Sequence, residues 1–165
     1  ASTDGEGVSQ MSEWDDRRHW ARSTAERVIK TQQLDETPVN PQDAAERLGL
    51  RVEFTTELDQ HVSGKLTYRS GEPVILVNGR DSRRRKRFTI AHEIGHYLDG
   101  AGVDVARDGV SNLEAFGCNE FAASLLMPER WFRADVREGY TNAELSAMYD
   151  LSLSAVRVRR ETLGI

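Results

Sequence analysis

The chain has 165 residues, a formal net charge of -5, 38% hydrophobic residues and 30% charged residues, which is typical of one soluble domain, alone or with a small appendage. The negative charge argues against a general nucleic-acid coat protein, and the short apolar runs exclude a membrane span. The single cysteine, Cys118, excludes a disulfide framework and fits a reducing cytoplasm.

The N-terminal third is predicted to hold two helices. Residues 1–11 are acidic and lack an apolar core, so we expect a disordered segment and not a signal peptide. Ser12 is a suitable N-cap for an amphipathic helix, because apolar residues then recur at helical spacing from Trp14 to Val28. A second, short helix is predicted to begin at Pro41 and to end at Gly49.

Three strand signals follow. Residues 50–54 alternate apolar and polar side chains, 66–68 form a second run, and 73–77 are almost wholly apolar, which favours a strand with both faces covered. We expect a small antiparallel or mixed sheet. Residues 63–66 are a candidate edge at which an extended peptide pairs as an additional strand, although an edge without a partner has the same pattern.

The central motif is H-E-x-x-H, formed by His92, Glu93 and His96 in a mostly apolar segment, 87–98. On a helix the two histidines are one turn apart and point the same way, so their imidazoles can hold two corners of a zinc tetrahedron. Glu93 is then placed to act as general base toward water. A single buried histidine is usually hydrogen-bonded core, but two with a glutamate between them favour a metal site.

Five cations, residues 83–87, precede the motif. Asp81 is the predicted cap of this helix. A run of this kind can bind nucleic acid or an acidic partner surface. A solvated helix face is the favoured interpretation, although cations at a helix N-terminus are not stabilised by the helix dipole.

A second helix, predicted over 113–127 and ended by Pro128, offers the remaining metal ligands. Glu114 lies four residues before Cys118 and seven before Phe121, so it is predicted on their inward face, where a carboxylate needs a partner such as zinc. The weaker candidates are Glu120, which points away from that face, and Cys118, which is more typical of packing. Asp104 in the preceding loop is a further alternative.

The last segment, 141–165, is predicted to form two short helices around a tight turn. Thr141 and Glu144 make a capping box, and Ser154 is a suitable cap for the final helix, which Gly164 ends. The pair has the form of a helix-turn-helix, and its second helix carries three arginines, Arg157, Arg159 and Arg160. Direct DNA binding is an alternative that this pattern allows but does not favour.

Three stretches together resemble the ImmA/IrrE family of metallopeptidases. Residues 88–98 are similar to its zinc signature, 118–128 to its second motif, and 145–164 to its tail. The resemblance implies a gluzincin-like site of two histidines, a glutamate from the second helix and a water. It also implies a cytoplasmic protease that cuts Xre-like helix-turn-helix repressors and so derepresses stress, prophage or mobile-element genes.

The second motif departs from the family pattern at one position. In the family, the ligand glutamate lies three residues before the Ala-Asn or Cys-Asn pair, where this chain has Ala115, and its glutamate is Glu114. The metal ligands predicted with the resemblance are therefore His92, His96 and Glu114. Asn119 resembles the residue that orients a zinc histidine.

The predicted fold is α+β: a small zincin-like domain over 12–135, with a three-stranded or slightly larger sheet packed on the H-E-x-x-H helix and a second ligand-bearing helix. A C-terminal helical pair over 136–165 packs on it. The predicted function is that of a zinc metalloendopeptidase acting on a helix-turn-helix repressor. The predicted metal is Zn²⁺, or another divalent ion such as Mn²⁺. The alternatives are a regulator that binds DNA or a repressor with a structural or sensory metal, and an inactive protease that binds a repressor.

Overall fold

The computed structural model describes the backbone of residues 3–100 and 112–165, and side chains from Glu13 onward within those ranges. It confirms the α+β class: the described residues form seven helices and a three-stranded sheet. The helices are α1 (Thr3–Thr31), α2 (Pro41–Arg47), α3 (Arg83–Leu98), α4 (Asn112–Leu126), α5 (Glu129–Arg137), α6 (Asn142–Tyr149) and α7 (Leu153–Leu163). The strands are β1 (Arg51–Thr55), β2 (Gly64–Arg69) and β3 (Glu72–Asn78). Within the described ranges, no helix is both long and apolar enough to cross a membrane.

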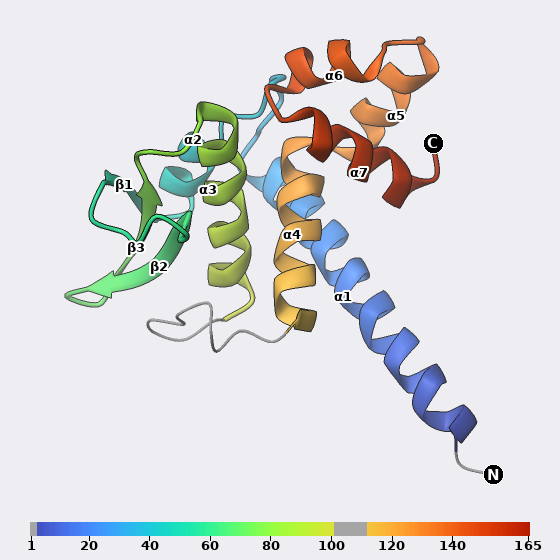
Figure 1. Ribbon diagram of the computed structural model, residues 1–165, viewed down its shortest axis with the longest axis horizontal. Helices are drawn as coiled ribbons and strands as arrows, with labels where there is room; N and C mark the ends of the chain where they lie inside the picture. Colours follow the sequence, from blue (N-terminus) through green and yellow to red (C-terminus); the bar gives the residue numbers. More distant parts are fainter. Residues whose placement is uncertain (1–2, 101–111) are drawn as a thin grey trace.

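Helix α1 begins at Thr3, ahead of the predicted cap at Ser12 and inside the segment for which disorder was expected. Acidic residues in the first turns of a helix are stabilised by its dipole, and the C-terminal half of α1 is held by packing. Ala21 and Ala25 there are fully buried, and α1 lies along α4, with its N-terminal end projecting away from the rest of the fold (Figure 1).

The sheet is mixed, with strand order β1-β3-β2. Strand β3 is central, pairing parallel with β1 and antiparallel with β2, so that Ile75 lies opposite Val52 on one side and Leu66 on the other. This position explains the apolar run that predicted a strand covered on both faces. Strand β2 lies at an edge of the sheet and packs against α3 (Figure 1).

Helix α3 is capped by Ser82, whose side chain accepts a hydrogen bond from the Arg85 amide; the predicted cap, Asp81, is therefore wrong by one residue. The cation run at the start of α3 is only partly the solvated face that was predicted. Arg83, Arg84 and Arg87 all lie within 2.6–3.5 Å of the Asp150 carboxylate. These ion pairs connect α3 to the end of α6.

Arg87 makes the most buried of these contacts. Its guanidinium donates to the backbone oxygens of Val39, Tyr149 and Asp150, and burial lowers its pKa, an effect that Asp150 partly opposes. Three carbonyls and a carboxylate replace the water that the guanidinium loses. The run thus joins the C-terminal helices to the domain.

The C-terminal helices follow the predicted capping pattern with one shift. Thr141 and Glu144 form the expected capping box of α6, and Gly164 ends α7 in the left-handed region. The cap of α7 is Ser152 and not Ser154, because Ser152 accepts the hydrogen bond from the Ala155 amide. Helix α5 lies in a segment for which no element was predicted, and it buries Phe132 against the core.

Gly64, at the start of β2, is predicted to tolerate no larger side chain. A Cβ atom there would lie 2.5 Å from Thr89 Cγ2 on α3 and 2.8 Å from the backbone oxygen of Leu76. Because a backbone atom cannot rotate away, we expect Gly64→Ala to lower the free energy of unfolding by about 1–3 kcal/mol in urea denaturation.

Gly79→Ala is the matched control, since its Cβ would meet the Thr55 backbone at an ordinary 3.5 Å. Equal denaturation midpoints for the two variants would contradict the close packing of β2 on α3.

Candidate metal centre

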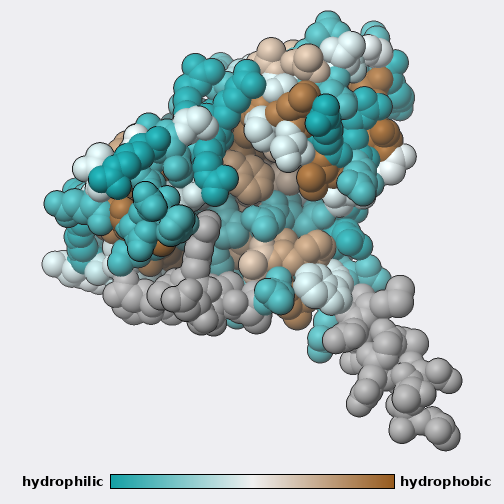
Figure 2. All heavy atoms as spheres, in the orientation of Figure 1, coloured by the Kyte–Doolittle hydropathy of each residue, from teal (hydrophilic) through white to brown (hydrophobic). Residues whose placement is uncertain are grey.

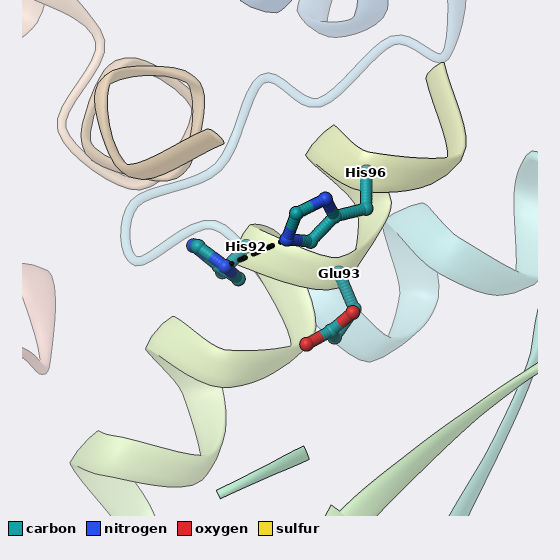
Figure 3. Close-up of side chains that lie close together, drawn as sticks. All are labelled: His92, Glu93 and His96. Atoms are coloured by element: carbon teal, nitrogen blue, oxygen red, sulfur yellow. Dashed lines mark hydrogen bonds between the residues drawn. The ribbon is translucent and has the colours of Figure 1, made fainter. Parts of the chain in front are cut away.

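One face of α3 brings together the three motif residues. The Nε2 atoms of His92 and His96 lie 3.0 Å apart, and the ligand atoms of these histidines and Glu93 all lie within 4.8 Å of one another. Figure 3 shows the two rings pointing toward one another with the Glu93 carboxylate beside them. All three side chains are buried, at 8%, 4% and 8% exposure for His92, Glu93 and His96.

This arrangement fits a zinc ion. Two nitrogens bound to tetrahedral zinc are about 3.3 Å apart, since each Zn–N bond is about 2.0–2.1 Å long. The observed separation of 3.0 Å between the His92 and His96 nitrogens needs only a small adjustment to reach that spacing. Two imidazoles and a buried carboxylate are also a donor set that zinc prefers.

The second helix, α4, reaches the outer nitrogen of each histidine. Asn119 Oδ1 lies 2.8 Å from His92 Nδ1. With the amide oxygen as acceptor, the His92 Nδ1–H donates, and its Nε2 presents a lone pair toward a metal. Asn119 therefore lies where a residue that orients a zinc histidine must lie.

Cys118 makes the corresponding contact to the other histidine. Its Sγ lies 3.5 Å from His96 Nδ1, on the side of the ring away from His92. Burial raises the pKa of the thiol to about 12, with Asp99 adding to the effect, so Cys118 is a neutral thiol at physiological pH. Because the thiol contacts the outer nitrogen of His96, on the side of the ring away from the two converging Nε2 atoms, Cys118 is placed as a packing and positioning group.

Both contacts depend on the close approach of α3 and α4. Gly95 lies on α3 between His92 and His96, and a Cβ atom there would lie 3.1 Å from Phe121 Cδ1 and 3.3 Å from Cys118 Cα. Only hydrogen at this position allows the helices to pack at the observed distance without displacement. The glycine in the middle of the motif thus has a packing role that the histidine spacing alone does not reveal.

Among the described residues, the cluster of His92, Glu93 and His96 includes none of the candidates for the third ligand. The structure does not group Glu114 with the motif residues; the inward face predicted for it is wrong, because its side chain is exposed in the first turn of α4. A carboxylate in a first turn is stabilised by the helix dipole. Glu120 is buried but lies 3.9 Å from both Arg18 and Arg22 of α1. Asp104 lies outside the described residues.

A cleft of about 890 Å³ opens beside the histidines, between α3, α4 and α7. His92 and Asn119 line it, together with Phe88, Phe116 and Val158. Figure 2 shows the hollow on this face, with hydrophobic side chains gathered around it. Sequence analysis did not predict the cleft, because its walls come from three helices that are far apart in the chain. The one available signal was an aliphatic residue, Val158, among the arginines of the last helix.

Most of the chain matches the profile of a known family. The Peptidase_M78 family, described as the IrrE N-terminal-like domain, matches residues 45–161. The chain belongs to the Peptidase_M78 family. This confirms the resemblance to ImmA/IrrE proteins that the motifs indicate, and membership implies a metal, for which the cluster of His92, Glu93 and His96 supplies ligands.

The fold of this Peptidase_M78 domain is similar to part of a solved protein. The similar structure is a Mycobacterium tuberculosis transcriptional regulator, with a TM-score of 0.61 and 15% sequence identity. The match covers 87% of this chain and 50% of that one, so the chain spans half the length of the regulator. At this identity the likeness shows a shared fold. No curated protein sequence matches the chain.

Asn119→Ala is predicted to weaken zinc binding by this Peptidase_M78 domain by about 10- to 100-fold, because His92 loses the acceptor that fixes its ring. Competition with a chromophoric chelator measures the affinity. Asn112→Ala, an exposed position on the same helix, is the control and is expected to leave zinc affinity unchanged. An unchanged affinity for Asn119→Ala would show that the amide does not orient the ring.

Proposed function

We propose that the chain is a zinc-dependent endopeptidase. The single observation that carries this proposal is the convergence of two imidazole Nε2 atoms beside the buried Glu93 carboxylate, next to a cleft that His92 lines. Membership of the Peptidase_M78 family supports a peptidase. A purely structural metal site would need neither the carboxylate nor a cleft that opens onto it.

His92 and His96 would hold the ion, with Glu114 as the proposed third ligand. The charge of Glu114 acts on the Cys118 thiol, which contacts His96, so the first turn of α4 lies near that histidine. Zn²⁺ in such a site would supply Lewis-acid chemistry, polarising a carbonyl and lowering the pKa of water to about 7. Another divalent ion such as Mn²⁺ would supply the same kind of chemistry with different preferred ligands.

Glu93 is the proposed general base. Its carboxylate would take a proton from the attacking water and pass it to the nitrogen of the leaving amine. Burial at 4% exposure keeps this carboxylate away from bulk water, where a proton would be lost to solvent. Asn119 and Cys118 hold the two imidazoles while the proton moves, through their contacts at the Nδ1 atoms.

Strand β2 is the proposed place where the substrate backbone pairs. In the described part of the chain, the strand pairs with β3 along one edge, and we place the extended peptide along the other. The first residue of β2, Gly64, lies against α3: a Cβ atom on Gly64 would be 3.8 Å from Glu93 Cγ. A peptide paired with β2 would therefore pass close to the proposed base.

The proposed substrate is a helix-turn-helix repressor in the cytoplasm, whose cleavage would derepress stress, prophage or mobile-element genes. The resemblance to the ImmA/IrrE family supports this choice, and the similar M. tuberculosis protein is named as a transcriptional regulator.

The arginines of α7 argue against the alternative, in which the chain is a regulator that binds DNA through α6 and α7. Arg159 is only 1% exposed and donates to the Met127 backbone oxygen. Arg160 donates to Asn142 Oδ1 and to the Ile165 backbone oxygen. Arg159 and Arg160 thus form hydrogen bonds within the protein. Of the three arginines, Arg157 is the exposed one. A single free arginine is a small basic surface for DNA.

Glu93→Gln is predicted to lower cleavage of a partner repressor by roughly a hundred- to ten-thousand-fold, because the amide cannot accept the proton of water. The assay mixes zinc-loaded protein with the repressor encoded beside this chain and follows the fragments by mass spectrometry, with zinc content measured in parallel. Zinc content is expected to stay at the wild-type value. Glu57→Gln, an exposed carboxylate, is the control. Cleavage that persists in Glu93→Gln would refute the proposed role.

Glu114→Gln is predicted to weaken zinc binding if the first turn of α4 supplies the third ligand, because an amide oxygen is a poorer zinc ligand than a carboxylate. Chelator competition for this variant and for the exposed control Glu138→Gln gives the comparison. Equal affinities for the two variants would exclude Glu114 as a ligand while leaving the two histidines and Glu93 in place.

A further inference from the structure

The cleft continues beyond the histidines along one face of α7. Ala155, Val158 and Thr162 line it at successive i, i+3 and i, i+4 spacings, which places them on one side of α7, and Leu153 lines it from the first turn. Two of them are large hydrophobic residues that are exposed, Leu153 at 37% and Val158 at 55%. Exposed aliphatic residues that gather at a cleft lined by a histidine of the candidate metal site indicate a binding surface.

The opposite wall is also apolar. Phe88 of α3 and Phe116 of α4 are both half-buried and line the cleft, and Met127 is fully buried at the junction of α4 and α5. Figure 2 shows hydrophobic side chains within the hollow and on its α7 side. An apolar side chain that enters the cleft would thus lose water on both faces, which is the main source of affinity in such sites.

The charges at the cleft are mainly positive, although the whole chain carries -5. Its lining includes three arginines, Arg84, Arg85 and Arg159, and one carboxylate, Glu120. Glu120 is already close to Arg18 and Arg22 on α1. Arg84 and Arg85 are the more exposed of these cations, with side chains 40% and 61% exposed; each already pairs with one carboxylate, Asp150 for Arg84 and Asp81 for Arg85. The surface therefore complements an occupant that carries negative charge beside its apolar residues.

We propose that this cleft binds the segment of the protein substrate next to the scissile bond, and that it selects an aliphatic or aromatic side chain with an acidic residue nearby. The apolar side chain contacts Val158 and Leu153, and the acidic one lies toward Arg84 and Arg85. This inference rests on the proposed peptidase function. It assigns the C-terminal helix pair to substrate recognition, since α7 forms a wall of the cleft.

The test uses binding, so that it does not depend on turnover. Zinc-loaded Glu93→Gln protein is incubated with a library of random dodecapeptides, and the retained peptides are sequenced. We expect enrichment of aliphatic or aromatic residues with an acidic residue close by. Adding Val158→Asp is expected to lower retention of these peptides by roughly tenfold, because the carboxylate removes an apolar contact and repels the acidic residue.

Arg157→Asp in the same background is the matched control. It places the same side chain one position away on α7, at an exposed residue that does not line the cleft, and it is expected to keep the enrichment. Arg85→Gln is expected to reduce the enrichment of acidic residues while the apolar preference stays.

Equal retention by the Val158→Asp and Arg157→Asp proteins would overturn the inference, as would a set of retained peptides without the apolar and acidic pattern. Neither result bears on Glu93-dependent cleavage of the repressor, which is measured separately. Enrichment without such cleavage would instead support the binding cleft and count against the proposed function.

Discussion

The close packing of α3 against α4 at Gly95 is the contact on which the candidate site depends. Because a glycine allows the Cα of Cys118 and the ring of Phe121 to approach α3, α4 reaches the outer nitrogen of both histidines. Asn119 then contacts His92 and Cys118 contacts His96. The ring orientations that bring the two Nε2 atoms to 3.0 Å are set by a neighbouring helix and not by the motif helix alone.

Buried arginines hold the C-terminal helices in position to form the cleft. Arg87 joins α3 to the end of α6 through backbone oxygens and Asp150. Arg159 of α7 donates to the Met127 backbone oxygen, and burial lowers its pKa to about 10, with Glu120 opposing the effect. Removing a guanidinium from water is unfavourable unless acceptors surround it. Both arginines meet that condition. Their hydrogen bonds and ion pairs therefore hold the C-terminal helices, including α7 with Val158, against the rest of the domain.

Prediction from the sequence succeeded where the pattern is local. The strands appeared within one or two residues of their predicted positions, the capping box of Thr141 and Glu144 formed as expected, and the H-E-x-x-H segment is a buried helix. It failed where distant segments decide the outcome. Periodicity placed Glu114 on an inward face, but the position lies in the first turn of α4, where the residue is exposed. Arg159 was considered for DNA contact, whereas it is buried against the end of α4.

The sequence by itself determined the helix that carries His92, Glu93 and His96, the strands before it and the family, because these follow from residue spacing along one segment. Only the tertiary structure decided which groups orient the histidines and which acceptors the buried arginines bond to. It also decided that a cleft extends along α7. Each of these depends on side chains from elements far apart in the chain meeting at one place, and the spacing within a segment carries no information about such meetings.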